Sequence, residues 1–330
     1  MDRDTLILTR AEVAALVDLE ACIAAVEGAF VALGHGRAPS SGILGIAASD
    51  GGFHVKAARL DGARPYVAVK TNGNFPRNRE RYDLPTIQGT ITLADGDTGR
   101  VLAVMDSIEI TIQRTGAATA VAAKYLARPE AATVTICGCG NQGRVQLRAL
   151  CRVRPIRRVL AWDGDWDRAK AYARDVAGEL GVRATAVTAP GPAARESDVV
   201  VTCTPATRWF LGSADVRAGT FVAAVGADSE EKQELEPALL AGATVVADVL
   251  EQAATIGDLH HALRAGLLTR AAVYAELSEI VTGAKPGRRT PAEITVFDST
   301  GTALQDVATA ALVYERALAA GVGWRVTLGD

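Results

Sequence analysis

The sequence predicts an α/β protein that combines a doubly wound parallel sheet with a separate α+β region near its N-terminus. From about residue 130 onward, short β-branched runs alternate with helical stretches, which is typical of a parallel sheet covered by helices. Between residues 41 and 106, apolar runs are separated by Gly, Pro and Asp turns, which favours a mostly antiparallel sheet. The 330 residues suffice for two hydrophobic cores.

The N-terminal region is expected to begin with a helix over residues 11–34. Asp18 can cap the segment LEACIAAVEGAFVAL, whose apolar residues recur at intervals of three and four. Short runs that read as strands follow, namely SGILGIA, GFHVKAARL, YVAVKTN, TIQGTITLAD and RVLAVMD. The alanine-rich stretch over residues 107–127 then predicts a helix that ends before Pro129.

The second region alternates strands with helices. The expected strands are ATVTICG, RRVLAWD, ATAVTA, DVVVTCT, TFVAAVG and ATVVAD. The expected helices include QGRVQLRALCRV and WDRAKAYARDVAGEL. A long amphipathic helix over residues 299–321 comes last and could return to the first region.

Composition argues against several classes of function. The net charge of −3 offers no basic field for nucleic acid or an anionic membrane, and 5% aromatic residues suggest no base-stacking platform. No window reaches the roughly 18 apolar residues that span a bilayer, and the charged N-terminus does not read as a targeting peptide. Five cysteines, an odd number, favour reduced thiols and a cytoplasmic location. Cys137 and Cys139 have no partner pair in register, so we expect no metal site.

A glycine-rich turn stands between a predicted strand and a predicted helix in TICGCGNQGRVQLRAL, residues 135–150. Gly138, Gly140 and Gly143 have the G-x-G-x-x-G spacing of dinucleotide-binding turns, and Asp163 ends the next strand 20 residues after Gly143. Such a turn presents backbone amides to a pyrophosphate, and the aspartate binds the ribose and repels a 2′-phosphate. This favours NAD over NADP. The alternative is a structural strand–turn–helix without a ligand.

Further stretches carry a resemblance to a known family. AVKTNGNFPRN (68–78), the long segment from LPTIQGT to AKYLA (84–127), VGADSEEKQEL (225–235) and FDSTGTALQD (297–306), with the glycine turn, are similar to the ornithine cyclodeaminase and mu-crystallin family. The resemblance spans nearly the whole chain. It implies a Rossmann NAD-binding domain over residues 116–311. It also implies a substrate-binding and dimerisation domain over residues 1–115, completed by the C-terminal helix 312–330.

The resemblance implies that Lys70 and Arg114 hold the substrate carboxylate, Lys70 also joining proton transfer. Without it, each side chain reads as a solvated charge, although the alanines around Arg114 suggest burial. Arg37 matches a third carboxylate-binding arginine of the family less closely. Lys56 falls where relatives carry an apolar residue or proline, so it adds a cation to the predicted pocket. His54 reads as a structural histidine rather than as a base.

Asp228 follows a predicted strand end, where parallel sheets bind ligands, and it matches the acid/base aspartate proposed for the cyclodeaminases. Its alternative role is to cap a helix formed by SEEKQEL, with Lys232 paired to it across one helical turn. Thr86 and Ser299 match positions that face the nicotinamide, although Thr86 could simply start a strand and Ser299 could cap a helix. The remaining residues expected to bind the cofactor are Asn141, Gln142, Thr115, Thr204 and Val225.

Together with the resemblance, these residues predict an NAD-dependent oxidoreductase that acts at the α carbon of a small L-amino acid or cyclic imino acid through an imine. The resemblance alone implies a homodimer. Two alternatives stay open. One is an ornithine-type cyclodeaminase, in which the substrate's own amine closes a ring, ammonia leaves and the hydride returns. The other is a ligand-binding protein of the mu-crystallin type. Only Asp228 is a clear candidate to bind a distal amine, and the extra Lys56 favours a short or acidic substrate.

Overall fold

The computed structural model describes residues 4–39 and 42–328, and the chain forms two compact units. Unit 1 comprises Met1–Arg114 and Thr302–Asp330, and unit 2 comprises Thr115–Gly301. The second division falls before the last helix rather than at residue 311, because that helix packs against strands and helices of unit 1. The assignment of substrate binding to one unit and cofactor binding to the other stays a prediction.

Unit 1 is built on a seven-stranded sheet with the order β17-β1-β6-β5-β4-β3-β2. Its strands are β1 (Asp4–Leu8), β2 (Leu44–Ala48), β3 (Gly51–Leu60), β4 (Tyr66–Asn74), β5 (Ile87–Asp95), β6 (Val101–Asp106) and β17 (Trp324–Thr327). Neighbours pair antiparallel except β1 with β6. The expected antiparallel sheet is therefore present. The strands β1 and β17, which were not predicted, extend the sheet at one edge. They pair with each other although they come from the N-terminal and C-terminal parts of the sequence.

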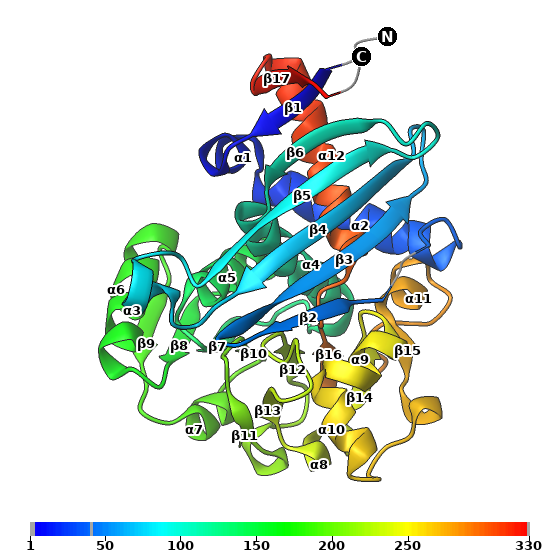
Figure 1. The fold of residues 1–330 in the computed structure, drawn as a ribbon. Helices are drawn as coiled ribbons and strands as arrows, with labels where there is room; N and C mark the ends of the chain where they lie inside the picture. Colours follow the sequence, from blue (N-terminus) through cyan, green and yellow to red (C-terminus); the bar gives the residue numbers. More distant parts are fainter. Residues whose placement is uncertain (1–3, 40–41, 329–330) are drawn as a thin grey trace. The chain divides into compact units, whose positions relative to one another are not determined.

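Helices of unit 1 cover one face of this sheet (Figure 1). They are α1 (Arg10–Leu16), α2 (Leu19–Gly34) and α12 (Ala303–Ala320), and α4 (Ile108–Leu126) begins here, whereas the short α3 (Asn78–Tyr82) lies in the connection between β4 and β5. The single helix expected over residues 11–34 is divided at Asp18, whose carboxylate caps α2 by accepting the Ala21 N–H at 2.9 Å. α12 packs against β3, β4 and α2, which brings its buried face onto the sheet.

Unit 2 is a doubly wound, all-parallel sheet with the strand order β15-β14-β16-β12-β10-β7-β8-β9 (Figure 1). The strands are β7 (Thr133–Cys137), β8 (Arg158–Trp162), β9 (Arg183–Ala186), β10 (Val199–Thr202), β12 (Phe221–Ala224), β14 (Thr244–Ala247), β15 (Ala275–Glu276) and β16 (Thr295–Asp298). The order reverses between β7 and β10, which is the ligand-binding switch point of a Rossmann-type sheet. The predicted fold class is confirmed, although β15 and β16 escaped prediction.

Short helices and a small ribbon complete unit 2. The helices are α5 (Asn141–Val153), α6 (Trp166–Leu180), α7 (Pro190–Arg195), α8 (Pro237–Ala241), α9 (Leu250–Ile256), α10 (Asp258–Arg264) and α11 (Leu277–Val281), with 3-10 turns η1 (Ser213–Asp215) and η2 (Arg270–Ala272). The ribbon pairs β11 (Thr207–Leu211) with β13 (Gln233–Leu235). A continuous apolar core lies within this unit, formed by strand residues such as Val200, Val222 and Val296.

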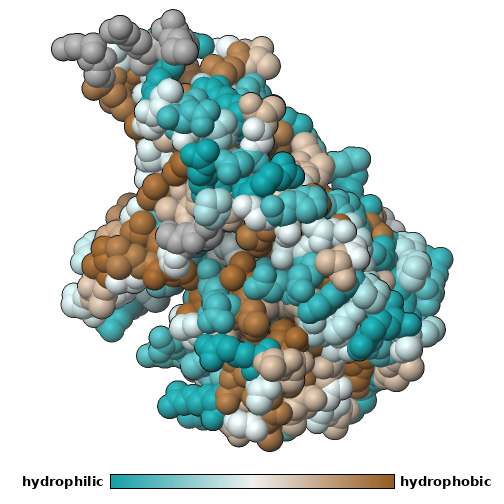
Figure 2. Space-filling model, turned by 90° about the vertical axis from the view of Figure 1, so that its right-hand side faces the viewer, coloured by the Kyte–Doolittle hydropathy of each residue, from teal (hydrophilic) through white to brown (hydrophobic). Residues whose placement is uncertain are grey.

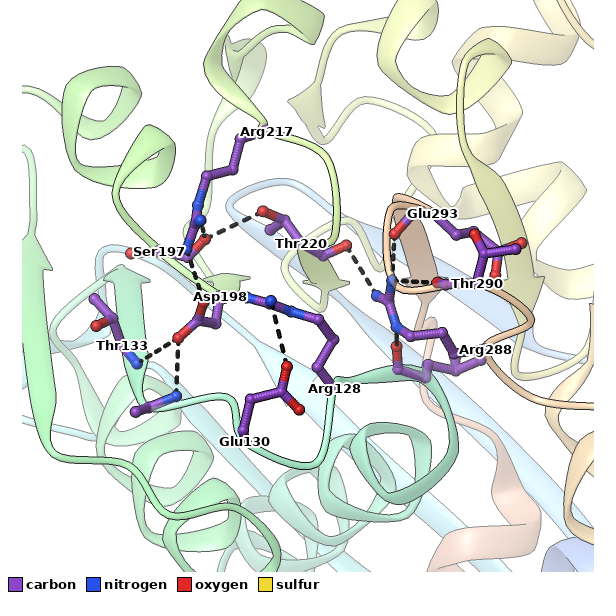
Figure 3. Close-up of polar contacts among 12 residues, drawn as sticks. Arg128, Glu130, Thr133, Ser197, Asp198, Arg217, Thr220, Arg288, Thr290 and Glu293 are labelled. Carbon is purple, nitrogen blue, oxygen red and sulfur yellow. Dashed lines mark hydrogen bonds and ion pairs between the residues drawn. The ribbon is translucent and has the colours of Figure 1, made fainter.

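The amino-terminal edge of the parallel sheet is held by a network around Asp198 (Figure 3). The Asp198 carboxylate accepts the backbone N–H groups of Ala132 and Thr133 at 2.9 and 3.0 Å, and it pairs with Arg128 and Arg217. These contacts join the start of β7 to the residue before β10 and to the loop before β12. We call this group the Asp198 network.

Arg288 extends the same edge toward β16 (Figure 3). Its guanidinium donates to the Leu126 and Thr220 carbonyl oxygens and to Thr295 Oγ1 at the start of β16. It also donates to the Glu293 carbonyl oxygen. One arginine thereby satisfies acceptors from three segments at this edge, namely the end of α4, the loop before β12 and the entry to β16.

Apolar side chains also reach the surface, where Figure 2 shows brown side chains gathered at the left of the view. In unit 1 the exposed large apolar residues include Leu44, Ile46, Phe53 and Ile87, all on strands of the sheet. β2 is exposed along its whole length. Within the described ranges, no helix is long and apolar enough to cross a bilayer.

Candidate active site

The glycine turn lies between β7 and α5 of unit 2. Gly138 has a φ of 108°, and a Cβ there would lie 2.7 Å from the carbonyl oxygen of Cys203. At Gly143 a Cβ would lie 2.0 Å from the Gly138 carbonyl oxygen, so the helix approaches the turn this closely only with glycine. A Cβ at Gly140 would meet no atom within 4 Å. The first and third glycines therefore serve the turn itself, whereas Gly140 leaves space for a ligand.

The first turn of α5 has no side-chain cap, because its N-cap residue is Gly140. Its backbone N–H groups can therefore donate to an anion. Asn141 beside them is exposed, and Gln142 Oε1 is buried without a hydrogen-bond partner among the described residues. This uncapped helix start and its open approach fit the pyrophosphate of a dinucleotide.

Asp163 follows β8 at the edge where the glycine turn lies. One carboxylate oxygen accepts the Cys139 N–H at 2.8 Å and the other accepts the Asp165 N–H at 2.9 Å. Each oxygen has a second lone pair, so the carboxylate can also accept from ribose hydroxyls. Two arginines near this turn, Arg144 and Arg168, could instead favour a 2′-phosphate. Arg144 pairs with Asp175 on α6, and Arg168 lies 3.8 Å from Asp163 itself.

Loops after β10, β12 and β16 supply the other predicted cofactor residues of unit 2. Thr204 follows β10 and donates its N–H and hydroxyl to Glu234 at 2.6 and 2.7 Å. Val225 follows β12, and Ser299 follows β16. Ser299 is buried, its hydroxyl lacks a hydrogen-bond partner among the described residues, and the N-cap of α12 is Thr302 instead. The interpretation of Ser299 as a helix cap is wrong.

Asp228 lies in the loop after β12 and is about half exposed. Lys232 Nζ contacts its carboxylate at 2.5 Å. The alternative interpretation, a helix over SEEKQEL capped by Asp228, is wrong, because residues 229–232 form a turn and β13 follows. β13 pairs with β11, and that pairing outweighs the local helical propensity of the glutamates and lysine.

Lys70 and Arg114 converge on a single carboxylate in unit 1. Lys70 Nζ lies 2.7 Å from Asp306 Oδ2, and Arg114 Nε lies 3.0 Å from Asp306 Oδ1. Arg114 also donates to Gln305 Oε1 at 3.0 Å, and Lys70 Nζ lies 3.5 Å from Thr111 Oγ1. Lys70, Arg114 and Asp306 are all at least 95% buried. The prediction from the sequence that Arg114 is buried is confirmed, and small residues neighbour it on α4.

Charge and burial set the protonation of this group. Burial lowers the pKa of Lys70 to about 7, and the Arg114 and Lys56 charges add to the effect while Asp306 opposes it. Burial would raise the pKa of Asp306, but Lys70 and Arg114 outweigh it and lower that pKa. Three cations thus act on one carboxylate, so Asp306 stays ionised while Lys70 titrates near neutral pH.

The remaining predicted residues of unit 1 lie in different settings. Lys56 stands directly opposite Lys70 in the β3–β4 pair and is buried. His54 precedes it by two residues on β3, on the same face, and is partly buried. Arg37 is exposed in the loop after α2, unlike the buried cations. Thr86 immediately precedes β5 and is partly buried.

Thr115 is buried on α4, beside Arg114 in the sequence. Its burial agrees with a cofactor or packing role, and its function stays a prediction. Among the described residues, no group of three or more His, Cys, Asp or Glu side chains is arranged to hold a metal ion.

Sequence reasoning missed Asp306 and Gln305, the partners of the two cations. Both lie in the first turns of α12 and are completely or almost completely buried. The available signal was a Gln-Asp pair inside an otherwise alanine- and valine-rich helix, where a buried acid needs a cation. Nothing local in the sequence says which cation, since Lys70 and Asp306 are 236 residues apart.

The chain matches the model of the ornithine cyclodeaminase/mu-crystallin family over residues 3–321. The class that the fold defines, a Rossmann-type unit joined to a mixed α/β unit, agrees with this match. The chain therefore belongs to the ornithine cyclodeaminase/mu-crystallin family, as the resemblance predicted.

Solved structures of relatives are similar over nearly the whole chain. An archaeal alanine dehydrogenase dimer with bound NAD is 38% identical, with a TM-score of 0.94 over 99% of this chain and 100% of the relative. The iminosuccinate reductase of Paracoccus denitrificans in complex with NAD⁺ is 35% identical, with a TM-score of 0.92 over 98% and 99%. A lysine cyclodeaminase is 33% identical, with a TM-score of 0.88 over 99% and 96%.

Proposed function

We propose that this protein is an NAD-dependent oxidoreductase that acts at the α carbon of a small L-amino acid or cyclic imino acid through an imine. The observation that carries the proposal is the convergence of buried Lys70 and Arg114 on one carboxylate. Buried cations require anions, and their fork and point-charge donors suit the α-carboxylate of an amino acid. The activities named for the similar dehydrogenase and reductase support the reaction class.

The cofactor is NAD, held at the glycine turn. When bound, NAD supplies the hydride acceptor, and NADH the donor, for chemistry at the α carbon. In this proposal the amides at the start of α5 bind the pyrophosphate and Asp163 binds the ribose. The NAD and NAD⁺ complexes of similar proteins support this choice, as does the pairing of Arg144 with Asp175.

The chain's own residues orient the substrate and move protons. Arg114 and Lys70 hold the carboxylate, which fixes the α carbon for reaction. Gln305 adds a donor, because its buried Nε2 has no hydrogen-bond partner among the described residues. Lys70, with a pKa of about 7, can accept a proton from the substrate ammonium near neutral pH. Asp228, paired with Lys232, is the second proton carrier.

Cyclodeamination is the second candidate, and the similar lysine cyclodeaminase is the observation that favours it. Ring closure requires a group that binds a distal amine. Lys56 disfavours the binding of a distal amine, because its positive charge lies close enough to shift the pKa values of both Lys70 and Asp306. That charge favours short or acidic substrates and supports the oxidoreductase. A ligand-binding protein of the mu-crystallin type is the non-enzymatic alternative.

The test is an assay that follows NADH absorbance and ammonia together, with NAD and a panel of alanine, aspartate, ornithine, lysine, arginine and proline. The proposal predicts equal amounts of NADH and ammonia for a primary amino acid, or NADH alone for proline. Lys70→Met should abolish this activity, whereas Lys170→Met, a change of an exposed lysine on α6, should not. Ammonia without net NADH would establish a cyclodeaminase instead.

Silence in that assay leads to the reverse direction, with NADH and either a cyclic imine or a 2-oxo acid plus ammonia. No turnover in either direction, with NADH binding retained, would overturn the enzymatic proposal and favour a binding protein. Substrate-dependent NADH oxidation would restore it as a reductase.

A homodimer is the expected assembly, through the sheet of unit 1. Leu44, Ile46 and Phe53 are exposed on β2 and β3, and contiguous apolar surface on a sheet marks an interface. The similar alanine dehydrogenase is a dimer. Sedimentation equilibrium should give a molar mass of two chains for the wild type. For Ile46→Arg it should give the mass of a single chain.

The buried thiols of Cys22, Cys137 and Cys139 support a cytoplasmic location.

A further inference from the structure

Three buried carboxylates lie at the carboxyl edge of the parallel sheet and have no part in the chemistry proposed above. They are Glu234 on β13, Asp258 at the start of α10 and Asp298 at the end of β16, and each has 0% exposure. We call them the carboxyl-edge acids. The charges that act on Glu234 and Asp298 come from other acids, and no lysine or arginine of the described residues pairs with any of the three. Unpaired buried acids are costly, so a compensating role is expected.

Glu234 ties together two loops that follow adjacent strands. Its Oε1 accepts the N–H and hydroxyl of Thr204, after β10, at 2.6 and 2.7 Å. Its Oε2 accepts the N–H of Gly226, after β12, at 2.9 Å. A Cβ at Gly226 would lie 2.5 Å from both Glu234 Oε2 and the Thr204 carbonyl oxygen. The carboxylate therefore fills the space between the loops and fixes their separation.

The loop after β10 in turn contacts the glycine turn. Cys203 Sγ donates to the Gly138 carbonyl oxygen at 3.3 Å, and the Cys203 carbonyl oxygen occupies the space where a Gly138 side chain would be. A shift of Thr204 is thus transmitted through its neighbour Cys203 to the turn. This continuous set of contacts connects Glu234 to the predicted pyrophosphate site.

Asp258 binds the backbone of β13, and Asp298 binds the backbone of α10, on which Asp258 lies. Asp258 Oδ1 accepts the N–H groups of Glu234 and Leu235 at 2.8 and 2.9 Å. Asp298 Oδ2 accepts the Leu259 N–H at 2.7 Å. Their other oxygens, Asp258 Oδ2 and Asp298 Oδ1, are buried without a hydrogen-bond partner in the described part of the chain.

We propose that Glu234 is a positioning residue for the cofactor, which aligns the loops after β10 and β12, and that protons retained among Glu234, Asp258 and Asp298 let the three acids stay buried together. The inference rests on the proposed binding of NAD. Burial raises the pKa of Asp258 to about 6, and burial with the Asp258 charge raises that of Asp298 well above its usual range. The ionisable groups that face this pair are Glu234 on β13 and Asp248 after β14.

The first test compares Glu234→Gln with Asp198→Asn, a matched neutralisation at the opposite edge of the same sheet. NADH fluorescence titration gives the affinity, and hydrogen exchange of the unliganded proteins reports on the loops. Glu234→Gln loses an acceptor for Thr204 or Gly226, so we expect about tenfold weaker NADH binding, the effect of one buried hydrogen bond. Peptides over residues 203–206 and 225–228 should exchange faster. Asp198→Asn should leave both readouts at their wild-type values.

Equal NADH affinity in Glu234→Gln and wild type, or equal losses in both variants, would overturn the proposal. Thr204→Val replaces Glu234→Gln if that variant does not fold; it removes the hydroxyl that donates to Glu234 and accepts the Ala206 N–H, and it keeps the Thr204 N–H bond to Glu234. It should weaken binding while Thr204→Ser restores it, and the absence of any difference between them would contradict the proposal. A wild type that binds no NADH would refute the NAD assignment instead, and loop exchange would still decide whether Glu234 positions the loops.

Discussion

Acids at the two edges of the parallel sheet in unit 2 have pKa values shifted in opposite directions. At the amino edge, burial would raise the pKa of Asp198, but backbone amides and the charges of Arg128 and Arg217 outweigh it and lower that pKa (Figure 3). At the carboxyl edge, burial and the charge of Asp258 raise the pKa of Glu234 to about 7. At the amino edge, the arginines neutralise the Asp198 charge and stabilise the fold. At the carboxyl edge, the buried acids destabilise the fold, at the place where the loops after β10 and β12 have to be aligned.

The largest expected effect is a loss of stability at the amino edge. Asp198→Ala removes the acceptor for two backbone N–H groups and leaves Arg128 and Arg217 facing each other. The free energy of unfolding should fall by about 3 kcal/mol, as when one partner of a partly buried ion pair is removed. Urea denaturation measures this change. NADH affinity should remain within about twofold, since distant sites act independently, and a large loss of affinity would break the contrast between the edges.

The second-largest effect is a difference in how the free energy of unfolding depends on pH at the two edges. Glu234 holds its proton up to about pH 7 in the folded protein and up to about 4.5 when unfolded. Its contribution to stability is therefore present below pH 4.5 and is lost as the pH rises to 7. As the pH rises from 4.5 to 7, the free energy of unfolding of Glu234→Gln should therefore increase relative to that of the wild type, on the order of 2 kcal/mol.

Asp198 has a lowered pKa, so its contribution is present above its unfolded pKa of 3.8 and is lost as the pH falls below it. The deficit of Asp198→Asn should therefore shrink only in acid. Urea titrations of both variants and wild type between pH 3 and 8 supply the curves. Parallel curves for the two variants would contradict the assignment of opposite charge states.

A smaller effect is expected at Gly140, where ligand binding and folding can be separated. Gly140→Ala places a methyl group in open space, so the free energy of unfolding should change by no more than about 1 kcal/mol. If the glycine turn binds NAD as proposed, the methyl group will obstruct the approach of the pyrophosphate, and NADH should bind about tenfold more weakly. Gly178→Ala, equally unobstructed but on α6, is the control and should bind NADH normally.

The smallest effect belongs to Arg217, whose side chain is 44% exposed. Arg217→Ala leaves Asp198 with Arg128 and both backbone donors. Such a half-exposed ion pair is worth less than about 1 kcal/mol, so the urea midpoint should shift only slightly. A loss as large as that of Asp198→Ala would show that the network depends on both arginines.

Local signals explain what could be predicted from the sequence. Gly138, Gly140 and Gly143 were found because spacing, preceding strand and following helix all lie within about twenty residues. Asp18 was found for the same reason, since a cap is read from its own helix. The alternation of strands and helices predicted the parallel sheet, although β15 and β16 were missed.

Long-range pairing explains what could not be predicted. Glu234 lies in SEEKQEL, which reads as a solvated helix, but the pairing of β13 with β11 and the packing of α10 on β13 bury it. Asp306 and Lys70 are joined by the packing of α12 on β4, which no local pattern encodes. The predicted roles of Arg37, Thr86 and Thr115 depend on a bound substrate or cofactor, and they stay predictions.

The position of Asp306 also bears on how the chain is synthesised. Lys70 and Arg114 leave the ribosome 236 and 192 residues before the acid that balances them. Unit 2, by contrast, is one uninterrupted segment and can fold as soon as residue 301 has emerged. Unit 1 is completed only when α12 and β17 have emerged, so Lys70 and Arg114 meet their carboxylate partner only after the whole of unit 2 has been synthesised.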